Sequence, residues 1–331
     1  MQLTQKKSRR GDLLTAAAVA MLLAVMAALL YTGSLTRQVT NMLIPTAVYI
    51  VMAVSLNLVV GLLGELSLGH AGFMSVGLFS GCLVAIALTN TALPLMVRLP
   101  VSMLVGGLTA AVFGLLVGLP TLRLRGDYLA IVTLACGEII KNIITNLRVT
   151  GGALGLNTSA IYAGAKELLP YGAALVLLTV AVMLNLKRSK YGRAIMAIRD
   201  NRIAAESVGL SVTRYKLAVF VIAAFFAGCA GVLYGHSLAN IKAAAFDYNM
   251  SIEILVIVVL GGMGSVPGSV VSAIVLTVLP EALREVADYR MLVYAVVLIL
   301  VMQATNNPAM KRFFGAACKS LTPKRKERAA L

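Results

Sequence analysis

The sequence predicts an all-α integral membrane protein, a polytopic helical bundle of about nine or ten transmembrane helices with glycine-interrupted half-helices. The first observation is composition, since 60% of the 331 residues are hydrophobic and 13% are charged, whereas a soluble domain has about 25% charged residues. The second is the recurrence of apolar segments close to the roughly 20 residues that a helix needs to cross a bilayer. The third is a pair of glycine-rich stretches, Gly61–Gly77 and Gly261–Gly268, that interrupt this pattern.

Each predicted span is a run of apolar residues, because a helix pairs its own backbone groups and an unpaired group in hydrocarbon is costly. In chain order the predicted spans are Leu13–Tyr31, Asn41–Val60, Leu68–Leu88, Leu99–Leu119, Tyr128–Leu147, Leu168–Leu186, Leu217–His236, Ser251–Leu283 and Met291–Gln303. The interrupted segment Ser251–Leu283 counts as one crossing or as two, and the total stays open for this reason.

The formal net charge of +16 gathers in clusters that lie on one side of the membrane if the spans alternate. The clusters are Lys6–Arg10, Arg123 with Arg125, Lys187–Lys216 and Lys311–Arg328. Basic residues are enriched in cytoplasmic loops of membrane proteins. We therefore expect a basic cytoplasmic N-terminus at 1–12, a transmembrane domain at 13–306 with a cytoplasmic loop at 187–216, and a basic cytoplasmic tail at 307–331. This distribution accounts for the charge without a nucleic-acid partner.

The interruption within Ser251–Leu283 predicts two half-helices. The first half, Ser251–Gly262, is too short to cross a hydrocarbon core of about 30 Å. Broken helices are tolerated in a membrane only where they are buried in protein or line a water-filled cavity, so the break is expected to lie on a translocation path. The stretch Gly61–Gly77 is a second break, and the two are either a true internal repeat or an accidental similarity. Interrupted segments of transporter repeats often meet at the substrate site.

Polar side chains at membrane depth usually face a bundle interior or a cavity. The candidates for the translocation path are Asn57, Ser67, His70, Glu138, Glu253, Gly262 and Ser265. His70 either is a buried, hydrogen-bonded structural residue or takes part in the path. Glu138 either pairs with Lys141 one turn later or lines an outer vestibule. Glu253 is likewise either a structural residue or part of a polar lining.

The cysteines and histidines do not indicate a metal site or a disulfide. Cys82, Cys136, Cys229 and Cys318 show no CxxC spacing, and the only histidines are His70 and His236. We expect the cysteines to act as small apolar packing residues.

The stretch YGRAIMAIRDNRIAAESVGL, Tyr191–Leu210, is too charged to lie in lipid. Asp200 or Asn201 can cap a short helix over Arg202–Val208, and Gly209 can end it. This helix either rests on anionic lipid headgroups or forms a contact surface for another protein. Its alanine face offers little apolar area for lipid, which favours the protein partner.

Several motifs together resemble the permease subunit, of the M type, of bacterial branched-chain amino-acid ABC importers. In order from about Asn57 to Tyr294 they are NLVVGLLGELSLGHAGFMSVG, LRLRGDYLAIVTLACGEIIKNI, TGGALGLN, YGRAIMAIRDNRIAAESVGLSVTRYKLAVFVIAAFFAGCAGVLYG, LVIVVLGGMGSVPGSVV and PEALRE. The resemblance implies the ABC-importer permease fold, a location in the bacterial inner membrane, and transport of leucine, isoleucine and valine.

In that family the cytoplasmic helix is a coupling helix that docks in a groove of an ATPase subunit. The matching positions imply ATPase-coupling residues at Arg199, Asp200, Arg202, Ala204, Ala205, Glu206 and Gly209. The implied partners are two cytoplasmic ATPase subunits that bind ATP and Mg²⁺, a second homologous permease that completes a heterodimer, and a periplasmic substrate-binding protein. Because the sequence has no GxxxxGK phosphate-binding loop, we expect neither enzymatic activity nor a bound cofactor in this chain.

Other functions remain open at this stage. Related permeases carry urea or short amides on the same architecture. A carrier driven by an ion gradient belongs to a different class and would use Asp127, Glu138 or Glu253, although it leaves the cytoplasmic helix unexplained. A membrane scaffold without transport is a third class.

Overall fold

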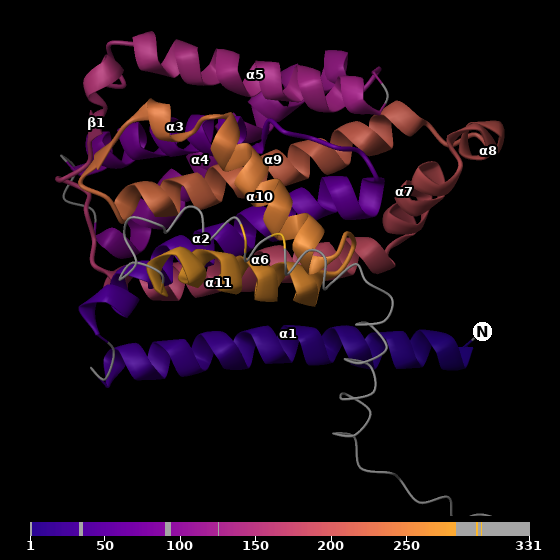
Figure 1. Ribbon diagram of the computed structural model, residues 1–331, viewed down its shortest axis with the longest axis horizontal. Helices are drawn as coiled ribbons and strands as arrows, with labels where there is room; N and C mark the ends of the chain where they lie inside the picture. Colours follow the sequence, from indigo (N-terminus) through magenta and orange to yellow (C-terminus); the bar gives the residue numbers. More distant parts are fainter. Residues whose placement is uncertain are drawn as a thin grey trace, which may run out of the picture. The chain divides into compact units, whose positions relative to one another are not determined.

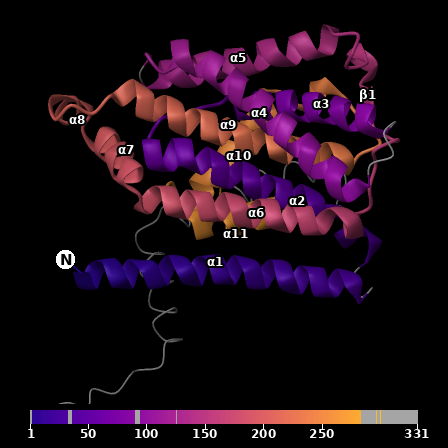
Figure 2. The same cartoon turned by 180° about the vertical axis from the view of Figure 1, so that it is seen from behind.

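The computed structural model describes residues 2–32, 36–89, 94–124 and 126–282, together with positions 296 and 299. The chain divides into two compact units, Met1–Val278 and Leu279–Leu331. Almost all of the described helices belong to the first unit. Figures 1 and 2 draw the chain in two views. The predicted span Met291–Gln303, the predicted tail at 307–331 and Cys318 lie outside the described residues, apart from the two single positions.

Long apolar helices make up the first unit and confirm the predicted polytopic helical bundle. Their bounds are α1 Gln2–Tyr31, α2 Arg37–Asn57, α3 His70–Thr89, α4 Leu95–Thr121, α5 Asp127–Asn146, α6 Ala165–Arg188 and α9 Val212–His236, followed by α10 Tyr248–Gly261 and α11 Val266–Ala282. A π-helical turn, η1 Leu58–Leu63, extends α2. Within the described part of the chain, seven segments are long and apolar enough to cross a membrane, and Ala16–Leu30 and Val266–Pro280 are shorter apolar helices.

The predicted break between the half-helices is present, because α10 ends at Gly261 and α11 begins at Val266. The predicted length of the first half is wrong. Helix α10 begins at Tyr248 rather than Ser251, and with the preceding 3-10 turn η3, Ala243–Ala245, the apolar segment Ala243–Gly261 reaches 19 residues. The cause is a helix cap, since the Asp247 carboxylate accepts a hydrogen bond from the Met250 amide at 3.2 Å and starts the helix early.

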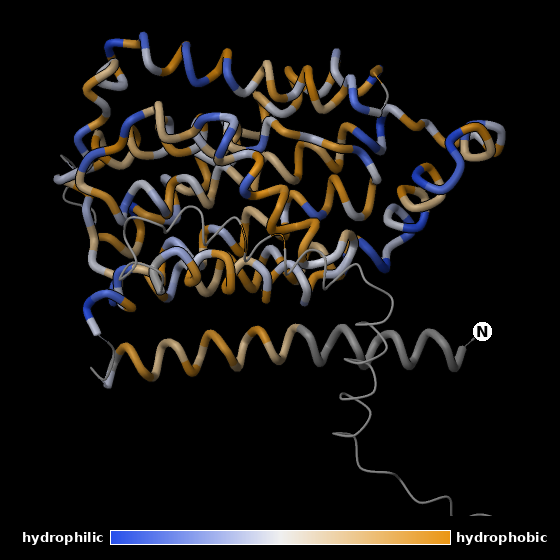
Figure 3. Tube along the Cα trace, viewed as in Figure 1, coloured by the Kyte–Doolittle hydropathy of each residue, from blue (hydrophilic) through white to orange (hydrophobic). Residues whose placement is uncertain are grey.

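Short elements connect the helices at the two ends. Helices α7 Lys190–Asp200 and α8 Arg202–Ser207 lie together at one end of the long helices in both views (Figures 1 and 2). Strands β1 Leu156–Asn157 and β2 Asn240–Ile241, with the turn η2 Gly152–Leu154, join the α5–α6 connection to the segment after α9. In Figure 3 the long helices are mostly hydrophobic, and hydrophilic stretches gather at the ends and around α7 and α8.

Helices α3, α4 and α9 approach one another through glycines. A Cβ atom added to Gly77 of α3 would lie 2.2 Å from Cα of Gly228 in α9, and one added to Gly106 of α4 would lie 2.5 Å from the Gly77 oxygen. Small residues let membrane helices pack backbone against backbone.

Replacing Gly77 with Val is expected to destabilise the protein by about 1–3 kcal/mol, because an overpacked contact must separate two backbones. The measurement is the unfolding temperature of the purified protein in detergent. Gly164→Ala is the matched control, since a Cβ atom there meets nothing within 4 Å and φ is −71°. Equal unfolding temperatures for the two variants would contradict the close approach of α3 and α9.

Candidate functional site

The two glycine-rich breaks meet through the side chain of Asn57, the last residue of α2. Its Nδ2 atom donates to the Ser265 backbone oxygen at 3.1 Å and to Ser269 Oγ at 2.8 Å. Its Oδ1 atom accepts from the Gly264 amide at 2.7 Å. Asn57 is fully buried, so its amide satisfies backbone groups that the second break leaves outside helical pairing.

Glycine allows the breaks to touch directly. A Cβ atom on Gly61 would lie 2.2 Å from the Gly264 nitrogen and 2.0 Å from Asn57 Oδ1. Gly64 ends the π-helical turn with φ of 78°, and Gly264 has φ of 81°, a region that glycine adopts without a steric penalty. The interrupted segments therefore lie against each other inside the bundle, whereas a true sequence repeat stays a prediction.

Two basic side chains, one from α7 and one from the end of α6, donate hydrogen bonds to the same two breaks. Arg199 of α7 donates from Nη1 to the Gly61 oxygen at 3.1 Å. Lys187, near the end of α6, donates from Nζ to the Gly264 oxygen at 3.0 Å. Each break thus has a backbone carbonyl that accepts a charged hydrogen bond from the 187–216 loop and its flanks. Lys187 was not among the predicted site residues.

The fold of the 187–216 loop follows from local capping. Ser189 Oγ accepts from the Gly192 amide at 3.0 Å and starts α7. Asn201 Oδ1 accepts from the Ala204 amide at 3.1 Å, which identifies Asn201 rather than Asp200 as the cap of α8. Gly209 follows with φ of 83°, as the predicted helix end requires. Helix α7 was not predicted, although Ile195 and Ile198 repeat at helical spacing.

The predicted coupling residues divide by exposure. Arg199, Asp200, Ala204, Glu206 and Gly209 are exposed and Arg202 is half-buried, whereas Ala205 is 3% exposed and packs with Ile198 and Val212. Ala205 therefore holds α8 against α7 and the start of α9.

The outward apolar surface of α8 comes from Ile203, which is 80% exposed, and Val208, which follows the helix and is 76% exposed. Both were missed by sequence reasoning. The sequence pattern that could have identified them is an apolar residue before and after the two alanines in a charged segment.

A buried ion pair joins the first break to α9. Lys216 Nζ donates to Glu65 Oε1, and Lys216 is 4% exposed. A buried charge requires a partner, so this pair fixes the segment after η1 to the same helix that carries the α7–α8 segment.

His70 and Ser67 differ in their surroundings. His70 Nε2 lies 2.8 Å from Ser55 Oγ, its ring meets Phe73 edge-on with centroids 6.4 Å apart, and it is buried. This geometry fits a buried, hydrogen-bonded structural role for His70. Ser67 is also buried, and its Oγ atom has no hydrogen-bond partner among the residues that the structure describes.

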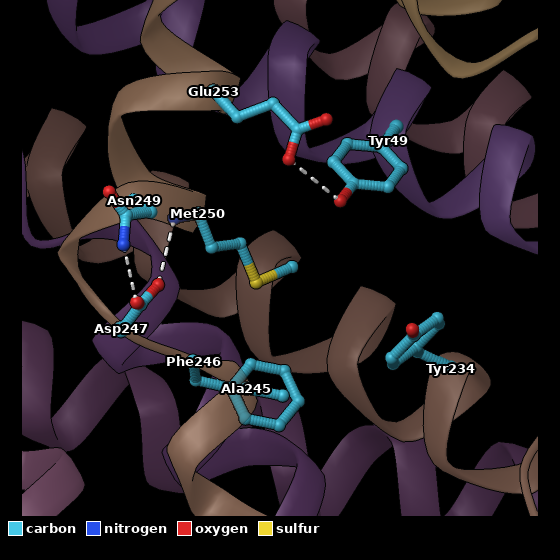
Figure 4. Close-up of a pocket in the computed structure, with 8 residues that line it drawn as sticks. All are labelled: Tyr49, Tyr234, Ala245, Phe246, Asp247, Asn249, Met250 and Glu253. Carbon is cyan, nitrogen blue, oxygen red and sulfur yellow. Dashed lines mark hydrogen bonds between the residues drawn. The ribbon is translucent and has the colours of Figure 1, made fainter. Parts of the chain in front are cut away.

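The two carboxylates of interest have separate environments. Glu138 pairs with Lys141 and accepts from the Tyr248 amide at 2.8 Å, so it links α5 to the start of α10. Glu253 accepts from the Tyr49 hydroxyl at 3.3 Å and lines a cavity of about 240 Å³ between α2, α9 and α10 (Figure 4). The structure thus places Asn57 and Ser265 where the two breaks meet and Glu253 in a separate cavity.

Helices of membrane-spanning length that surround two broken segments define a polytopic membrane permease. The family described as "Branched-chain amino acid transport system / permease component" matches residues 38–302, and the chain belongs to this family. Within the described residues no group of three or more His, Cys, Asp or Glu side chains could hold a metal ion.

Relatives of the chain are named for different substrates. The chain is 37% identical over 290 residues to the high-affinity branched-chain amino acid transport system permease protein LivM of Escherichia coli K12, and 36% identical over 296 residues to the protein of that name from Salmonella typhimurium LT2. Each alignment covers 78% of this chain and 66% of the relative, so the chain spans less than two thirds of their length. The ribose import permease protein RbsC of Haemophilus influenzae is 25% identical over 287 residues, with 83% and 86% covered. No solved structure matches the chain.

Proposed function

We propose that this chain is the transmembrane permease subunit of an ATP-driven importer of branched-chain amino acids in the bacterial inner membrane, with both termini in the cytoplasm. Support comes from its family and from its similarity to LivM along most of its length. The substrate is the finer part of the proposal, because a more distant relative is named for ribose.

Coupling to an external energy source is supported above all by the contacts of Arg199 and Lys187 with the two breaks. ATP and Mg²⁺ would be bound by two cytoplasmic ATPase subunits that contact α8. Movement of the α7–α8 segment would pull on the Gly61 carbonyl through Arg199. Movement of the end of α6, which leads into α7, would pull on the Gly264 carbonyl through Lys187. Since Ala205, Ile198 and Val212 pack α8 against α7 and α9, the segment would move as one rigid body, which a switch between two packed states requires.

The translocation path would follow the interrupted segments. Asn57, Gly262 and Ser265 lie at their meeting point, and Ser67 supplies a buried hydroxyl near the first break. At broken helix ends, backbone amides can donate to the carboxylate of an amino acid and backbone carbonyls can accept from its ammonium group, without forming a strong binding site. A second homologous permease would complete the path, and a periplasmic binding protein would select and deliver the substrate.

Uptake of labelled leucine should depend on the chain and on its ATPase partners. The experiment expresses the chain with the neighbouring permease, ATPase and binding-protein genes in a strain without its own branched-chain amino-acid uptake, and compares labelled leucine with labelled urea and ribose. We expect leucine uptake that disappears when the ATPase genes are omitted. Uptake of urea or ribose without leucine would contradict the proposed substrate class. Leucine uptake without the ATPase genes would favour a carrier driven by an ion gradient.

A further inference from the structure

The cavity at Glu253 combines a carboxylate with aromatic rings. Tyr49 of α2, Tyr234 of α9 and Phe246, Asp247, Met250 and Glu253 at the start of α10 contribute to its wall. Figure 4 shows Glu253 and Tyr49 directed toward each other above the Met250 side chain, with Tyr234 on the facing helix. Its volume is about 240 Å³, well above the roughly 10–15 Å³ that a single water molecule needs. The space suits a small metabolite.

Glu253 is the carboxylate in this wall that is available to a ligand. Asp247 is used in capping, because its two oxygens accept from the Met250 amide at 3.2 Å and from Asn249 Nδ2 at 2.7 Å. Within the described part of the chain, Glu253 accepts one hydrogen bond, from the Tyr49 hydroxyl, and forms no ion pair. An ionisable group in a membrane segment is costly and usually has a functional partner.

No basic side chain from the described residues lines the cavity. Lys141, on the neighbouring helix α5, already pairs with Glu138. The rings of Tyr234 and Phe246 stand at 90° with centroids 6.4 Å apart, and the faces of aromatic rings attract cations. The wall therefore offers negative charge and π-electron density together, which favours a positively charged ligand group and disfavours a free carboxylate.

We propose that this cavity binds the ammonium group of the transported amino acid, with Glu253 as its counter-ion and Tyr49 holding the Glu253 carboxylate in place. The proposal rests on the proposed function for the identity of the ligand. The predicted topology puts the start of α10 on the periplasmic side, so an incoming amino acid would meet this cavity before the breaks at Gly61 and Gly264. Urea and ribose have no ammonium group and would gain nothing from Glu253.

The test uses the complex of the full chain with its permease and ATPase partners, purified into lipid nanodiscs without the binding protein. Thermal stabilisation is measured with three compounds that share the leucine side chain. Leucine has both charged groups, leucinol has the ammonium group without the carboxylate, and 4-methylpentanoate has the carboxylate without the ammonium group. We expect stabilisation by leucine and leucinol but not by 4-methylpentanoate. Glu253→Gln keeps the acceptor for Tyr49 but loses a charged hydrogen bond. The leucine or leucinol concentration needed for the same stabilisation should therefore rise about tenfold or more.

Glu167→Gln is the matched control, since Glu167 is an exposed carboxylate in the first turn of α6. Stabilisation by 4-methylpentanoate equal to that by leucinol, an unchanged Glu253→Gln variant, or no stabilisation by any of the three would overturn the cavity proposal. Leucine uptake that is normal in Glu253→Gln cells would do the same while leaving the proposed function intact. If leucinol stabilises the purified complex and this is lost in Glu253→Gln, while cells with the unchanged protein take up no amino acid, the proposed function alone would be overturned.

Discussion

Replacing both Ile203 and Val208 with Glu should abolish copurification of the ATPase subunits with this chain. The two side chains form the exposed apolar surface of the α8 segment, and burying a side chain of this size in a partner contributes roughly 1.5–3 kcal/mol. Losing both contributions, and placing charge in their stead, should weaken the complex at least about a hundredfold. The measurement is the yield of ATPase in a pull-down through a tag on this chain.

Ser207→Glu is the matched control for this double variant. It adds one of the two negative charges to the same exposed helix without removing apolar surface. We expect ATPase yield near that of the unchanged protein. If the double variant retains full ATPase yield, α8 is not the docking surface, and if Ser207→Glu loses it equally, charge rather than apolar burial controls the contact.

The membrane spans could be predicted from the sequence because lipid imposes one rule on every segment. A run of apolar residues must form a helix that pairs its own backbone groups, and this rule identified each described long helix. Local chemistry was also sufficient for the cap at Asn201 and the helix end at Gly209. The first half-helix was predicted too short because the cap at Asp247 was not recognised.

The face of α8 that points outward could not be predicted in the same way. Ala204 and Ala205 are adjacent and chemically equal, and only the position of α7 and α9 decides that Ala205 is buried. A substitution such as Ala205→Glu therefore disturbs the folding of the loop before it reports on docking. The exposure of Ile203 and Val208 was missed for the same reason.

Contacts between distant segments were also beyond sequence reasoning. Asn57 and Gly264 are separated by 207 residues, and Lys216 and Glu65 by 151. Glycine-rich composition predicted that each break is buried, but no pattern in a single sequence says which side chain bridges them. The contacts of Lys187 and Arg199 with the breaks have the same character, because a basic residue near a helix end is ordinarily interpreted as a topology signal.

The contacts of Lys187 and Arg199 with the breaks predict a large effect on transport. Changing Arg199 and Lys187 together to Met should separate ATP hydrolysis from transport. Met keeps an unbranched apolar side chain of similar reach but cannot donate to the oxygens of Gly61 and Gly264. A hydrogen bond from a charged group contributes about 1.5–3 kcal/mol, so uptake of leucine should fall roughly tenfold or more. The ATPase subunits should still copurify and hydrolyse ATP, because neither side chain belongs to the exposed apolar surface of α8.

The measurement compares leucine uptake per ATP hydrolysed in proteoliposomes that contain the whole complex. Arg214→Met is the control, because Arg214 is an exposed basic residue near the start of α9, at the α8 end of that helix, and it should leave the ratio unchanged. Each single variant should give a partial loss, since one break remains connected to the loop. A double variant that transports leucine with the normal ratio would mean that force reaches the breaks by another route, such as the Lys216–Glu65 pair.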